Sequence, residues 1–255
     1  MDSGLETKAR HMNNLTVIYY TSNFLEDTNP YFLKNTKEYL LKAIGDLPMV
    51  IVSQKPCLFG PNSVNINLGD IGRSHLNIYR QMLIGAKEAT TDFVALAEDD
   101  ILYSYEHFHN HYIGKWNDLF LYDMNKLSMF TWIKPPLYSF RHDRMVVNQL
   151  IAPRLQFIEA LEERFERVRQ LMENGMKEEK IIKYWGDIGR YEDILGVTVR
   201  KTKTFMCTMP SIVFTHENAF GYLNHGKRKR LGDLRITEVP GWGRAEDILK
   251  LYFKP

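Results

Sequence analysis

The sequence has few cysteines and no long hydrophobic segment. Cys57 and Cys207 are its two cysteines, and neither belongs to a CxxC pair, so a disulfide framework is excluded and a thiolate zinc site is not expected. No apolar run approaches the ~20 residues that cross a bilayer, and the first ten residues have no apolar signal region. We therefore expect a protein of a reducing, cytoplasmic compartment.

An excess of one charge sign is also absent. The 33 basic and 31 acidic residues leave a formal net charge of +2, which excludes a histone-like positive coat but not a local basic patch. Hydrophobic residues make up 44% of the 255 residues, which excludes a disordered protein and allows a full core. The pair His11-Met12 resembles a cloning-site scar, so we expect 1–11 to be an expression tag and 12–255 to form a single domain.

The first half of the chain alternates predicted strands and helices. Apolar and β-branched runs predict strands at 15–20, 49–53 and 93–97, and apolar residues at helical spacing predict helices at 31–44 and 73–89. Short links between such elements favour an α/β fold with right-handed crossovers and a parallel sheet.

The second half is less regular. We expect a strand at 129–133, a long charged helix at 154–175, a helix near 188–199, a strand at 211–215 and a short amphipathic helix at 244–253. No internal repeat or low-complexity linker separates the halves, which predicts that they share one core.

Three consecutive carboxylates, Glu98, Asp99 and Asp100, follow the predicted strand at 93–97. Ligands of open α/β sheets bind at the carboxyl ends of the strands. Three adjacent carboxylates repel each other there unless a cation is bound, and Mg²⁺ or Mn²⁺ is the natural partner. The alternative is the acidic first turn of a helix, where the dipole favours negative side chains.

Two segments resemble family-2 glycosyltransferases of the GT-A fold. The first is GRSHLNIYRQMLIGAKEATTDFVALAEDD, similar to the part of the family in which a nucleotide-binding βαβ unit leads to an acidic metal-binding motif. The second is GRYEDILGVTVRKTKTFMCTMPSIVFTH, similar to a later part in which Glu-Asp opens a helix ahead of a strand that ends in His. The resemblance implies a GT-A-like (Rossmann-like), mostly parallel central sheet flanked by helices, with a helical insertion at 154–175.

The same resemblance implies an activity. A metal-dependent enzyme of this family moves a hexosyl or pentosyl group from a nucleotide sugar, typically a UDP-sugar, to an acceptor hydroxyl. Residues 12–128 are then the nucleotide-sugar-binding half and 129–255 the acceptor-binding half.

Site residues are implied by their match to the family's motifs. Asp100 is expected to be the nearest ligand of Mn²⁺ or Mg²⁺, with Asp99 and Glu98 as further ligands or ribose contacts. His216, which ends the predicted strand at 211–215, is expected to complete the metal site. For His216 the alternative is an ordinary surface or core histidine.

Glu192 and Asp193 match the family's catalytic pair. Asp193 is expected to be the base that accepts the acceptor's proton, and a single base with in-line attack implies inversion at the anomeric carbon. Glu192 is the alternative base, since adjacent residues on a helix point about 100° apart. The alternative is that Glu192 and Asp193 are exposed carboxylates on a helix without a catalytic role.

Donor contacts are expected in the loops after the first two strands. Thr21, Ser22, Gln54, Lys55 and Arg73 are the candidates for binding the nucleotide sugar, and ordinary loop polarity is the alternative for each.

A basic segment near the end of the chain is the candidate for acceptor or diphosphate binding. It contains Lys227, Arg228, Lys229 and Arg230, and Trp242 follows between two glycines. The stretch FTHENAFGYLNHGKRKR resembles phage-encoded family members that glycosylate hydroxymethylated pyrimidines in DNA. It implies a DNA acceptor and, for a phage-encoded protein, the host cytoplasm. The alternatives are a solvated basic turn and, for Trp242, a buried anchor.

Other functions remain open. The acceptor of a glycosyltransferase is alternatively a glycan or a protein. A sugar nucleotidyltransferase also places carboxylates and Mg²⁺ after a strand, although the loop after the first strand here lacks the glycines of a phosphate loop. A non-enzymatic nucleic-acid-binding protein leaves the acidic triplet without a role.

A run of alternating histidines is the last motif. His107, His109 and His111 occur in EHFHNHY, and on a helix the three do not converge on one metal ion. We interpret them as structural.

Overall fold

The computed structural model describes residues 14–110, 113, 116–140, 144–185, 187–217, 219, 232 and 234–254. The expected expression tag at 1–11 and the basic cluster Lys227, Arg228, Lys229 and Arg230 lie outside the described residues.

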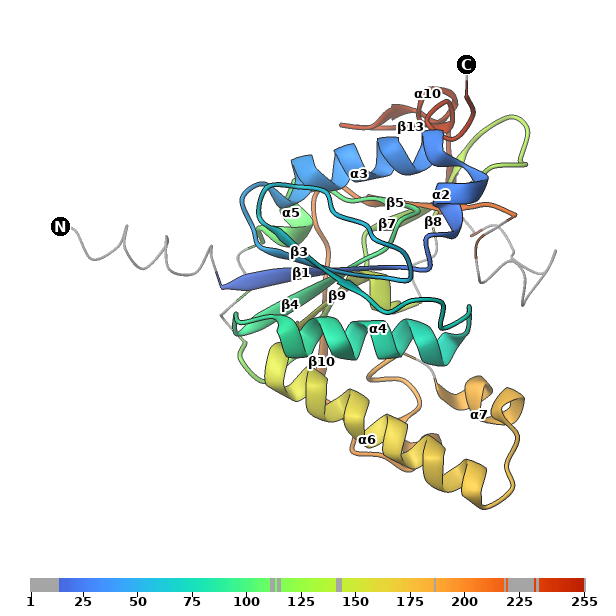
Figure 1. Ribbon diagram of the computed structural model, residues 1–255. Helices are drawn as coiled ribbons and strands as arrows, with labels where there is room; N and C mark the ends of the chain where they lie inside the picture. Colours follow the sequence, from blue (N-terminus) through green and yellow to red (C-terminus); the bar gives the residue numbers. More distant parts are fainter. Residues whose placement is uncertain are drawn as a thin grey trace.

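A seven-stranded sheet forms the centre of the fold, in the order β10-β6-β9-β4-β1-β2-β3 (Figure 1). Its strands are β1 (Leu15–Thr21), β2 (Met49–Ser53), β3 (Ser63–Asn67), β4 (Phe93–Ala97), β6 (Phe120–Asp123), β9 (Leu150–Pro153) and β10 (Thr202–Phe205). Only β9 pairs antiparallel with its neighbours, β4 and β6. The mostly parallel α/β sheet expected from the sequence is therefore confirmed.

Helices cover both faces of this sheet (Figure 1). The helices α2 (Phe24–Thr28), α3 (Pro30–Ile44) and α5 (Tyr105–Phe108) lie on one face, and α4 (His75–Glu88), α6 (Arg154–Glu173), α7 (Glu178–Trp185) and α8 (Glu192–Leu195) lie on the other. The long charged helix predicted at 154–175 is α6, which packs on α4. No helix in the described ranges combines the length and the apolar composition needed to cross a membrane.

A second sheet of five strands stands beside the first, in the order β12-β8-β7-β11-β5. Its strands are β5 (Ile101–Leu102), β7 (Lys126–Phe130), β8 (Tyr138–Phe140), β11 (Ser211–Thr215) and β12 (Leu234–Ile236), and the chain ends with the hairpin β13 (Glu238–Val239) and β14 (Gly243–Arg244) and the helix α10 (Ala245–Leu249). The chain passes from the central sheet into the second sheet three times, from β4 to β5, from β6 to β7 and from β10 to β11.

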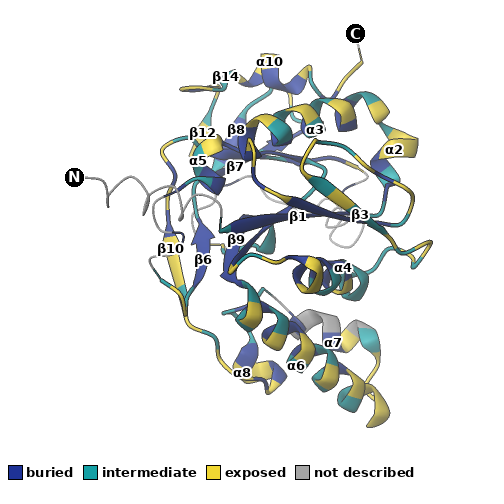
Figure 2. Cartoon of the chain, turned by 60° about the vertical axis from the view of Figure 1, so that its left-hand side comes forward, coloured by how far each residue is buried: buried dark blue, intermediate teal, exposed yellow. Residues whose placement is uncertain are grey.

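Burial explains why β1 and β4 occupy the middle of the sheet. All seven residues of β1 and all five of β4 are buried, and β1 is dark blue in Figure 2. Successive side chains of a strand point to opposite faces, so Ile18 and Leu96 join the core under α4, whereas Val17 and Ala95 join the core under α3. The first of these cores draws residues from both halves of the chain, from Ile18 to Val197.

Two sequence predictions need correction. The helix expected near 188–199 is only the four residues of α8, because Gly189 and Gly196 have φ angles of 91° and 75° and interrupt the helical backbone. The strand expected at 129–133 lies at 126–130, since it pairs with β11 in that register.

Gly85 allows the close approach of α4 to the sheet, which makes a stability test. A Cβ atom at this position stands 2.5 Å from Cγ2 of Ile18 and 3.2 Å from Cγ2 of Val52. We expect Gly85→Ala to lower the free energy of unfolding by about 1–3 kcal/mol through overpacking, despite alanine's higher helix propensity. Urea denaturation measures this. The exposed Glu88→Ala on the same helix is the control, and an equally small effect of both substitutions contradicts the packing account.

Candidate active site

The acidic triplet lies at the carboxyl edge of the central sheet, as its position after a buried strand predicts. In the parallel pairing of β1 with β4, Tyr19 is opposite Ala97, which places Thr21 at the level of Asp99. The Thr21 hydroxyl donates a hydrogen bond of 2.6 Å to Oδ2 of Asp99. The backbone oxygen of Asp99 accepts a further bond of 2.9 Å from the hydroxyl of Thr36 on α3.

Glu98 points to the opposite face, where two neutral donors hold its carboxylate. The Tyr20 hydroxyl donates to Oε1 at 2.6 Å, and the Asn148 amide donates to Oε2 at 2.8 Å. The Tyr103 hydroxyl accepts from the backbone nitrogen of Glu98 and donates to the backbone oxygen of Asn148, both at 3.1 Å. Glu98 is thus fixed to β1 and to the turn that precedes β9.

The second sheet brings His216 to Asp100. Directly after the triplet, β5 pairs antiparallel with β11, and the Phe214 nitrogen donates to the backbone oxygen of Asp100 at 3.0 Å. His216 follows the end of β11, so its Nε2 lies 3.5 Å from Oδ2 of Asp100. The predicted proximity of His216 to the acidic cluster is present in the structure.

Asp100 and His216 carry polar atoms that the rest of the described chain does not satisfy. Oδ1 of Asp100 and both ring nitrogens of His216 are buried without a hydrogen-bond partner among the described residues. His216 is 2% exposed and packs against the rings of Phe32 and Tyr252. Buried polar atoms of this kind are costly unless a ligand, ion or water binds them.

Crowding and burial raise the pKa values of the two carboxyls that precede Asp100. Burial, together with the charge of Asp100, raises the pKa of Glu98 to about 7, although the bonds from Tyr20 and Asn148 oppose this shift. Burial and the same charge raise the pKa of Asp99 to about 6, against the bond from Thr21. Both shifts express the cost of placing three negative charges in a poorly solvated place.

A hard divalent cation fits this donor set. Mg²⁺ and Mn²⁺ take carboxylate oxygens, and imidazole nitrogen is an accepted ligand of transition metals. Asp100 offers an unpartnered oxygen and His216 an unpartnered nitrogen, and Asp99 lies next to them. A bound cation also compensates the repulsion that raises the pKa values of Glu98 and Asp99.

The loop residues expected to bind the donor fall into two groups. Thr21 lies in the acidic cluster, and Arg73 is near it: burial lowers the pKa of Arg73 while the charge of Asp99 opposes the shift. The guanidinium of Arg73 also lies 3.9 Å from the ring centroid of Phe24. Ser22 is half-buried in the same loop. These three residues border the cluster in the part of the sheet edge where β1 ends.

Gln54 and Lys55 have other partners. The Gln54 amide donates to the backbone oxygen of Gly72 at 2.9 Å, and the Lys55 ammonium pairs with Asp27 at 2.6 Å on the surface. Their backbone nitrogens both donate to Oδ1 of Asn23 at 2.9 Å. Asn23, which sequence reasoning missed, therefore fixes the loop after β2 to the loop after β1.

The two expected bases differ in their surroundings. Glu192 is buried and accepts a 2.8 Å bond from Arg164 on α6, as well as a bond from the backbone nitrogen of Gly189. Its carboxylate is thus part of an internal ion pair that holds α8 on α6. Asp193 is exposed on α8, which lies beside α6 in the lower helical layer (Figure 2). Among the described residues, no hydrogen bond or ion pair connects Asp193 with the acidic cluster.

Asp187, which sequence reasoning missed, is connected to the acidic cluster through the turn before β9. Its carboxylate accepts from the backbone nitrogen of Val147 at 2.9 Å, and the next residue, Asn148, holds Glu98. Arg190 pairs with Asp187 at 2.9 Å. No residue pattern marks Asp187 in the sequence, because its neighbourhood depends on the turn before β9.

Trp242 is anchored between the segment that precedes β11 and the helix α3. Its indole nitrogen donates to the backbone oxygen of Pro210 at 2.7 Å, and its ring lies 5.7 Å from that of Tyr39. Of the two interpretations of Trp242, these contacts favour the anchor.

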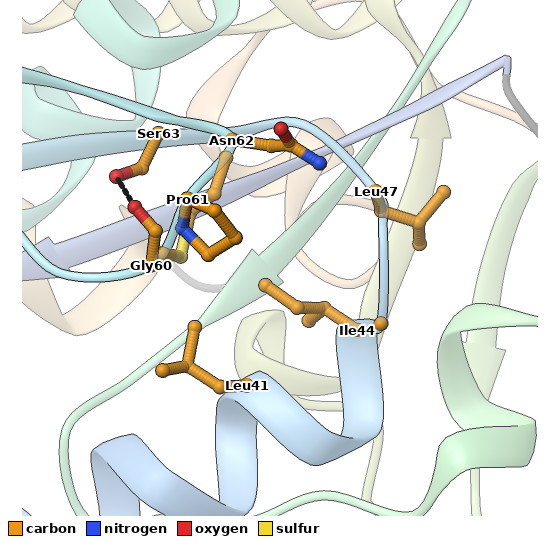
Figure 3. Close-up of a pocket in the computed structure, with 9 residues that line it drawn as sticks. Leu41, Ile44, Leu47, Gly60, Pro61, Asn62 and Ser63 are labelled. Atoms are coloured by element: carbon orange, nitrogen blue, oxygen red, sulfur yellow. Dashed lines mark hydrogen bonds between the residues drawn. The ribbon is translucent and has the colours of Figure 1, made fainter.

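A small pocket at the amino edge of the central sheet is unrelated to the acidic cluster (Figure 3). It lies between the end of α3 and the starts of β2 and β3, and is lined by Leu41, Ile44, Gly45, Leu47, Met49, Gly60, Pro61, Asn62 and Ser63. The lining offers no titratable side chain, and the carboxylates lie at the opposite ends of the strands. The pocket is therefore not the candidate active site.

Comparison with known proteins gives distant structural similarities. No protein-family model matches the sequence, and no curated protein sequence matches it. The apo form of the glycosyltransferase GlyE from Streptococcus pneumoniae is similar at a TM-score of 0.41 and 9% identity, over 75% of this chain and 45% of that chain. TarS 1–349 from S. aureus, in complex with UDP-GlcNAc, is similar at 0.44 and 11%, over 79% and 58%.

A nucleotidyltransferase is about equally similar. The 2-C-methyl-D-erythritol 4-phosphate cytidylyltransferase from Thermus thermophilus gives a TM-score of 0.41 and 10% identity, over 75% of this chain and 87% of that chain. This chain spans about half the length of the two glycosyltransferases above. At such distances the activities of these proteins do not transfer to this chain, and its function must be argued from its own residues.

The raised pKa values predict a pH dependence of stability in the absence of divalent metal. A folded-state pKa above the unfolded one makes the native state bind more protons, so the contribution of Glu98 is favourable below about pH 4.5 and is lost as the pH rises through about 7. We expect Glu98→Gln to stabilise the protein more at pH 8 than at pH 5, by on the order of 1 kcal/mol or more.

Urea denaturation of both proteins at the two pH values measures this difference. Glu88→Gln, an exposed change on α4, is the control. The same stability difference at both pH values contradicts the assigned environment of Glu98.

Proposed function

We propose that the protein is a metal-dependent glycosyltransferase that uses a nucleotide-sugar donor. One observation carries the proposal: at the carboxyl edge of a mostly parallel sheet, Asp100 and His216 lie 3.5 Å apart with buried, unpartnered ligand atoms in the described part of the chain. This is the edge at which open α/β sheets bind their ligands. The resemblance of the two sequence segments to family-2 glycosyltransferases connects this edge with sugar transfer.

The residues at the edge divide the work of the reaction between them. Asp100 and His216 would hold Mn²⁺ or Mg²⁺, with Asp99 beside them, and the cation supplies charge neutralisation for a departing diphosphate. Thr21 keeps Asp99 oriented, and Tyr20 and Asn148 keep Glu98 oriented. Such fixed orientation is what a preorganised site requires.

The donor's nucleotide is proposed to lie over the ends of β1 and β2. Arg73 supplies a positive charge near Asp99, and Thr21 and Ser22 supply hydroxyls at the same loop. Gln54 and Lys55 would contribute mainly through their backbone, because their side chains already bind Gly72 and Asp27. A UDP-sugar is the proposed donor.

The metal assignment predicts the behaviour of one conservative variant. Asp100→Asn keeps the size of the side chain and removes its negative charge, so we expect Mn²⁺ affinity to fall at least tenfold and transfer to fall by about 10²-fold or more. Isothermal titration with Mn²⁺ and transfer of labelled sugar from UDP-sugars measure the two effects.

The control for this variant is Asp118→Asn, which changes an exposed carboxylate that pairs with Lys201 at the surface. Full transfer by Asp100→Asn in the presence of a chelator would refute the metal assignment. Release of diphosphate with formation of a nucleotide sugar from a sugar phosphate identifies a nucleotidyltransferase instead.

The catalytic base is proposed to be Asp193, with inversion at the anomeric carbon. We expect Asp193→Asn to leave donor binding intact and to lower turnover by about 10²–10⁴-fold. Glu192→Gln should instead lower thermal stability, since it breaks the buried pair with Arg164.

Asp187→Asn is the decisive comparison for this assignment. Unchanged turnover in Asp193→Asn together with a large loss in Asp187→Asn moves the base to Asp187. The stereochemistry of the product, read by nuclear magnetic resonance, separately tests inversion.

The acceptor is proposed to be DNA that carries a hydroxymethylated pyrimidine, held in part by Lys227, Arg228, Lys229 and Arg230. A chain of net charge +2 binds DNA only through a local patch. This cluster is the densest group of cations in the sequence, and it follows His216 within about fifteen residues. A glycan or protein acceptor is the alternative.

Salt dependence tests the DNA acceptor. With about three phosphate contacts, the logarithm of the binding constant should fall against the logarithm of salt with a slope of about −2.7 on duplex DNA. Replacing the four cations by alanine should raise the KM for DNA and leave the KM for the donor unchanged. Transfer of labelled sugar to glycans or proteins, with no transfer to hydroxymethylated DNA, would refute this acceptor.

A further inference from the structure

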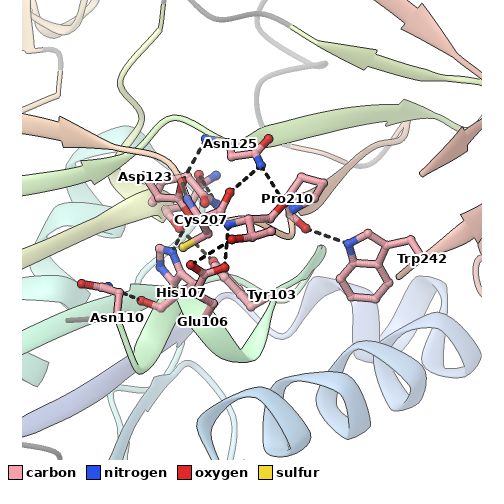
Figure 4. A network of polar contacts seen from close by, with 12 residues as sticks. Tyr103, Glu106, His107, Asn110, Asp123, Asn125, Cys207, Pro210 and Trp242 are labelled. Atoms are coloured by element: carbon pink, nitrogen blue, oxygen red, sulfur yellow. Dashed lines mark hydrogen bonds and ion pairs between the residues drawn. The ribbon is translucent and has the colours of Figure 1, made fainter. Parts of the chain in front are cut away.

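Three potential metal ligands converge in the interior, away from the acidic triplet. His107 on α5, Asp123 at the end of β6 and Cys207 after β10 each place one ligand atom within 4.8 Å of the other two (Figure 4). His107 and Asp123 are fully buried, and Cys207 is 2% exposed. The sequence did not predict this cluster, because its members are separated by up to 100 positions and Cys207 has no neighbouring cysteine.

The cluster sits where the chain passes between the two sheets. Asp123 is the last residue of β6, which lies in the central sheet, and Lys126 begins β7 in the second sheet. Cys207 lies in the segment between β10 of the central sheet and β11 of the second. Two of the three passages from the central sheet into the second therefore meet at this point.

The backbone around the cluster is fixed by hydrogen bonds (Figure 4). Oδ1 of Asp123 accepts from the nitrogens of Asn125 at 2.9 Å and Cys207 at 3.2 Å. The Asn125 amide donates to the backbone oxygen of Cys207 at 2.7 Å, and the nitrogen of Thr208 donates to Glu106 at 2.5 Å. Oδ2 of Asp123 is left to face Nδ1 of His107.

We propose that His107, Asp123 and Cys207 form a structural zinc site that joins the two sheets. The 3.2 Å between Nδ1 of His107 and Oδ2 of Asp123 is close to the edge of a tetrahedron of zinc ligands, about 3.3 Å for ligand distances of about 2.0–2.1 Å. Thiolate, imidazole and carboxylate are all zinc ligands. A water molecule takes the fourth position.

Charge balance favours zinc in so dry a place. One carboxylate, one thiolate and one neutral imidazole cancel the two positive charges of Zn²⁺, so the loaded site is electrically neutral. Binding breaks the S–H bond of Cys207, forms a bond between sulfur and zinc, and releases one proton to solvent. Because binding releases a proton, zinc affinity should increase with pH.

The site differs from the proposed catalytic site in the metal that it selects. Asp100 and His216 suit a cation that exchanges with solvent, whereas a buried thiolate favours zinc over Mg²⁺ or Mn²⁺. The proposal therefore stands or fails separately from the glycosyltransferase activity.

Metal content and cobalt spectroscopy of the full chain test the proposal. After dialysis against metal-free buffer, the wild-type protein should retain about one zinc ion per chain, as measured by inductively coupled plasma mass spectrometry. The cobalt-loaded protein should show the near-ultraviolet charge-transfer band of a thiolate bound to Co²⁺. Zinc affinity should rise between pH 6 and pH 8. If binding releases one proton, the rise is about tenfold for each pH unit.

Matched variants identify the ligands. Cys207→Ser should remove both the zinc and the charge-transfer band, and Asp123→Asn should weaken zinc binding at least tenfold. Cys57→Ser changes the other buried cysteine, which lies 3.4 Å from Lys37, and should change neither signal. His109→Asn, a half-buried histidine on the same segment, and Asp100→Asn should also leave both signals intact.

Wild-type protein without zinc and without a cobalt charge-transfer band overturns the proposal, and the cluster is then a hydrogen-bond network of His107, Asp123 and a protonated Cys207. A band that persists in Cys207→Ser also overturns it. Because the wild-type spectra decide the question, failure of a variant to fold does not leave it open.

Discussion

The central physical constraint in this structure is the mutual repulsion of three carboxylates, Glu98, Asp99 and Asp100, at the end of a fully buried strand. Consecutive side chains alternate direction, so the carboxylates meet different surroundings. Glu98 is bound by Tyr20 and Asn148, and Asp99 by Thr21, whereas Asp100 faces the imidazole of His216 with one oxygen unpartnered in the described structure. Among the described residues, the side-chain hydrogen-bond partners of Glu98 and Asp99 are neutral donors, which hold the carboxylates in place but do not cancel their charge. A divalent cation is the simplest species that does.

The second sheet positions His216 beside Asp100. Because β5 begins directly after the triplet and pairs with β11, the position of His216 beside Asp100 follows from two hydrogen-bonded strands and not from a mobile loop. The crossings from β6 to β7 and from β10 to β11 hold β11 in register with β7. The buried residues His107, Asp123 and Cys207 lie at these two crossings. Their packing therefore affects the position of β11, and through it the position of His216 beside Asp100.

The sequence predicted the parts of the structure that depend on local pattern. The runs in β1, β2 and β4 are mostly apolar, which is typical of strands buried on both faces. The carboxylates after β4 were predicted to lie at the carboxyl edge because they follow a buried strand, and His216 was assigned to the same site by the resemblance to family-2 glycosyltransferases. The structure places them together.

Residues whose roles depend on tertiary contacts could not be found in this way. Asn148 holds Glu98 only because β9 inserts antiparallel next to β4, and no pattern in a four-residue strand announces that pairing. Glu192 and Asp193 are adjacent and chemically similar in the sequence, and only the packing of Arg164 distinguishes the buried carboxylate from the exposed one. Two glycines with positive φ shortened the helix predicted around them.

Crystals grown with Mn²⁺ and a non-transferable UDP-sugar analogue test the central claim most directly. Anomalous diffraction at the manganese edge locates the ion without any assumption about activity. The account predicts one manganese peak in contact with Asp100 and His216, with the diphosphate of the analogue on its open side. A peak elsewhere, or no peak at saturating Mn²⁺, would contradict the claim that this edge is a metal-dependent donor site.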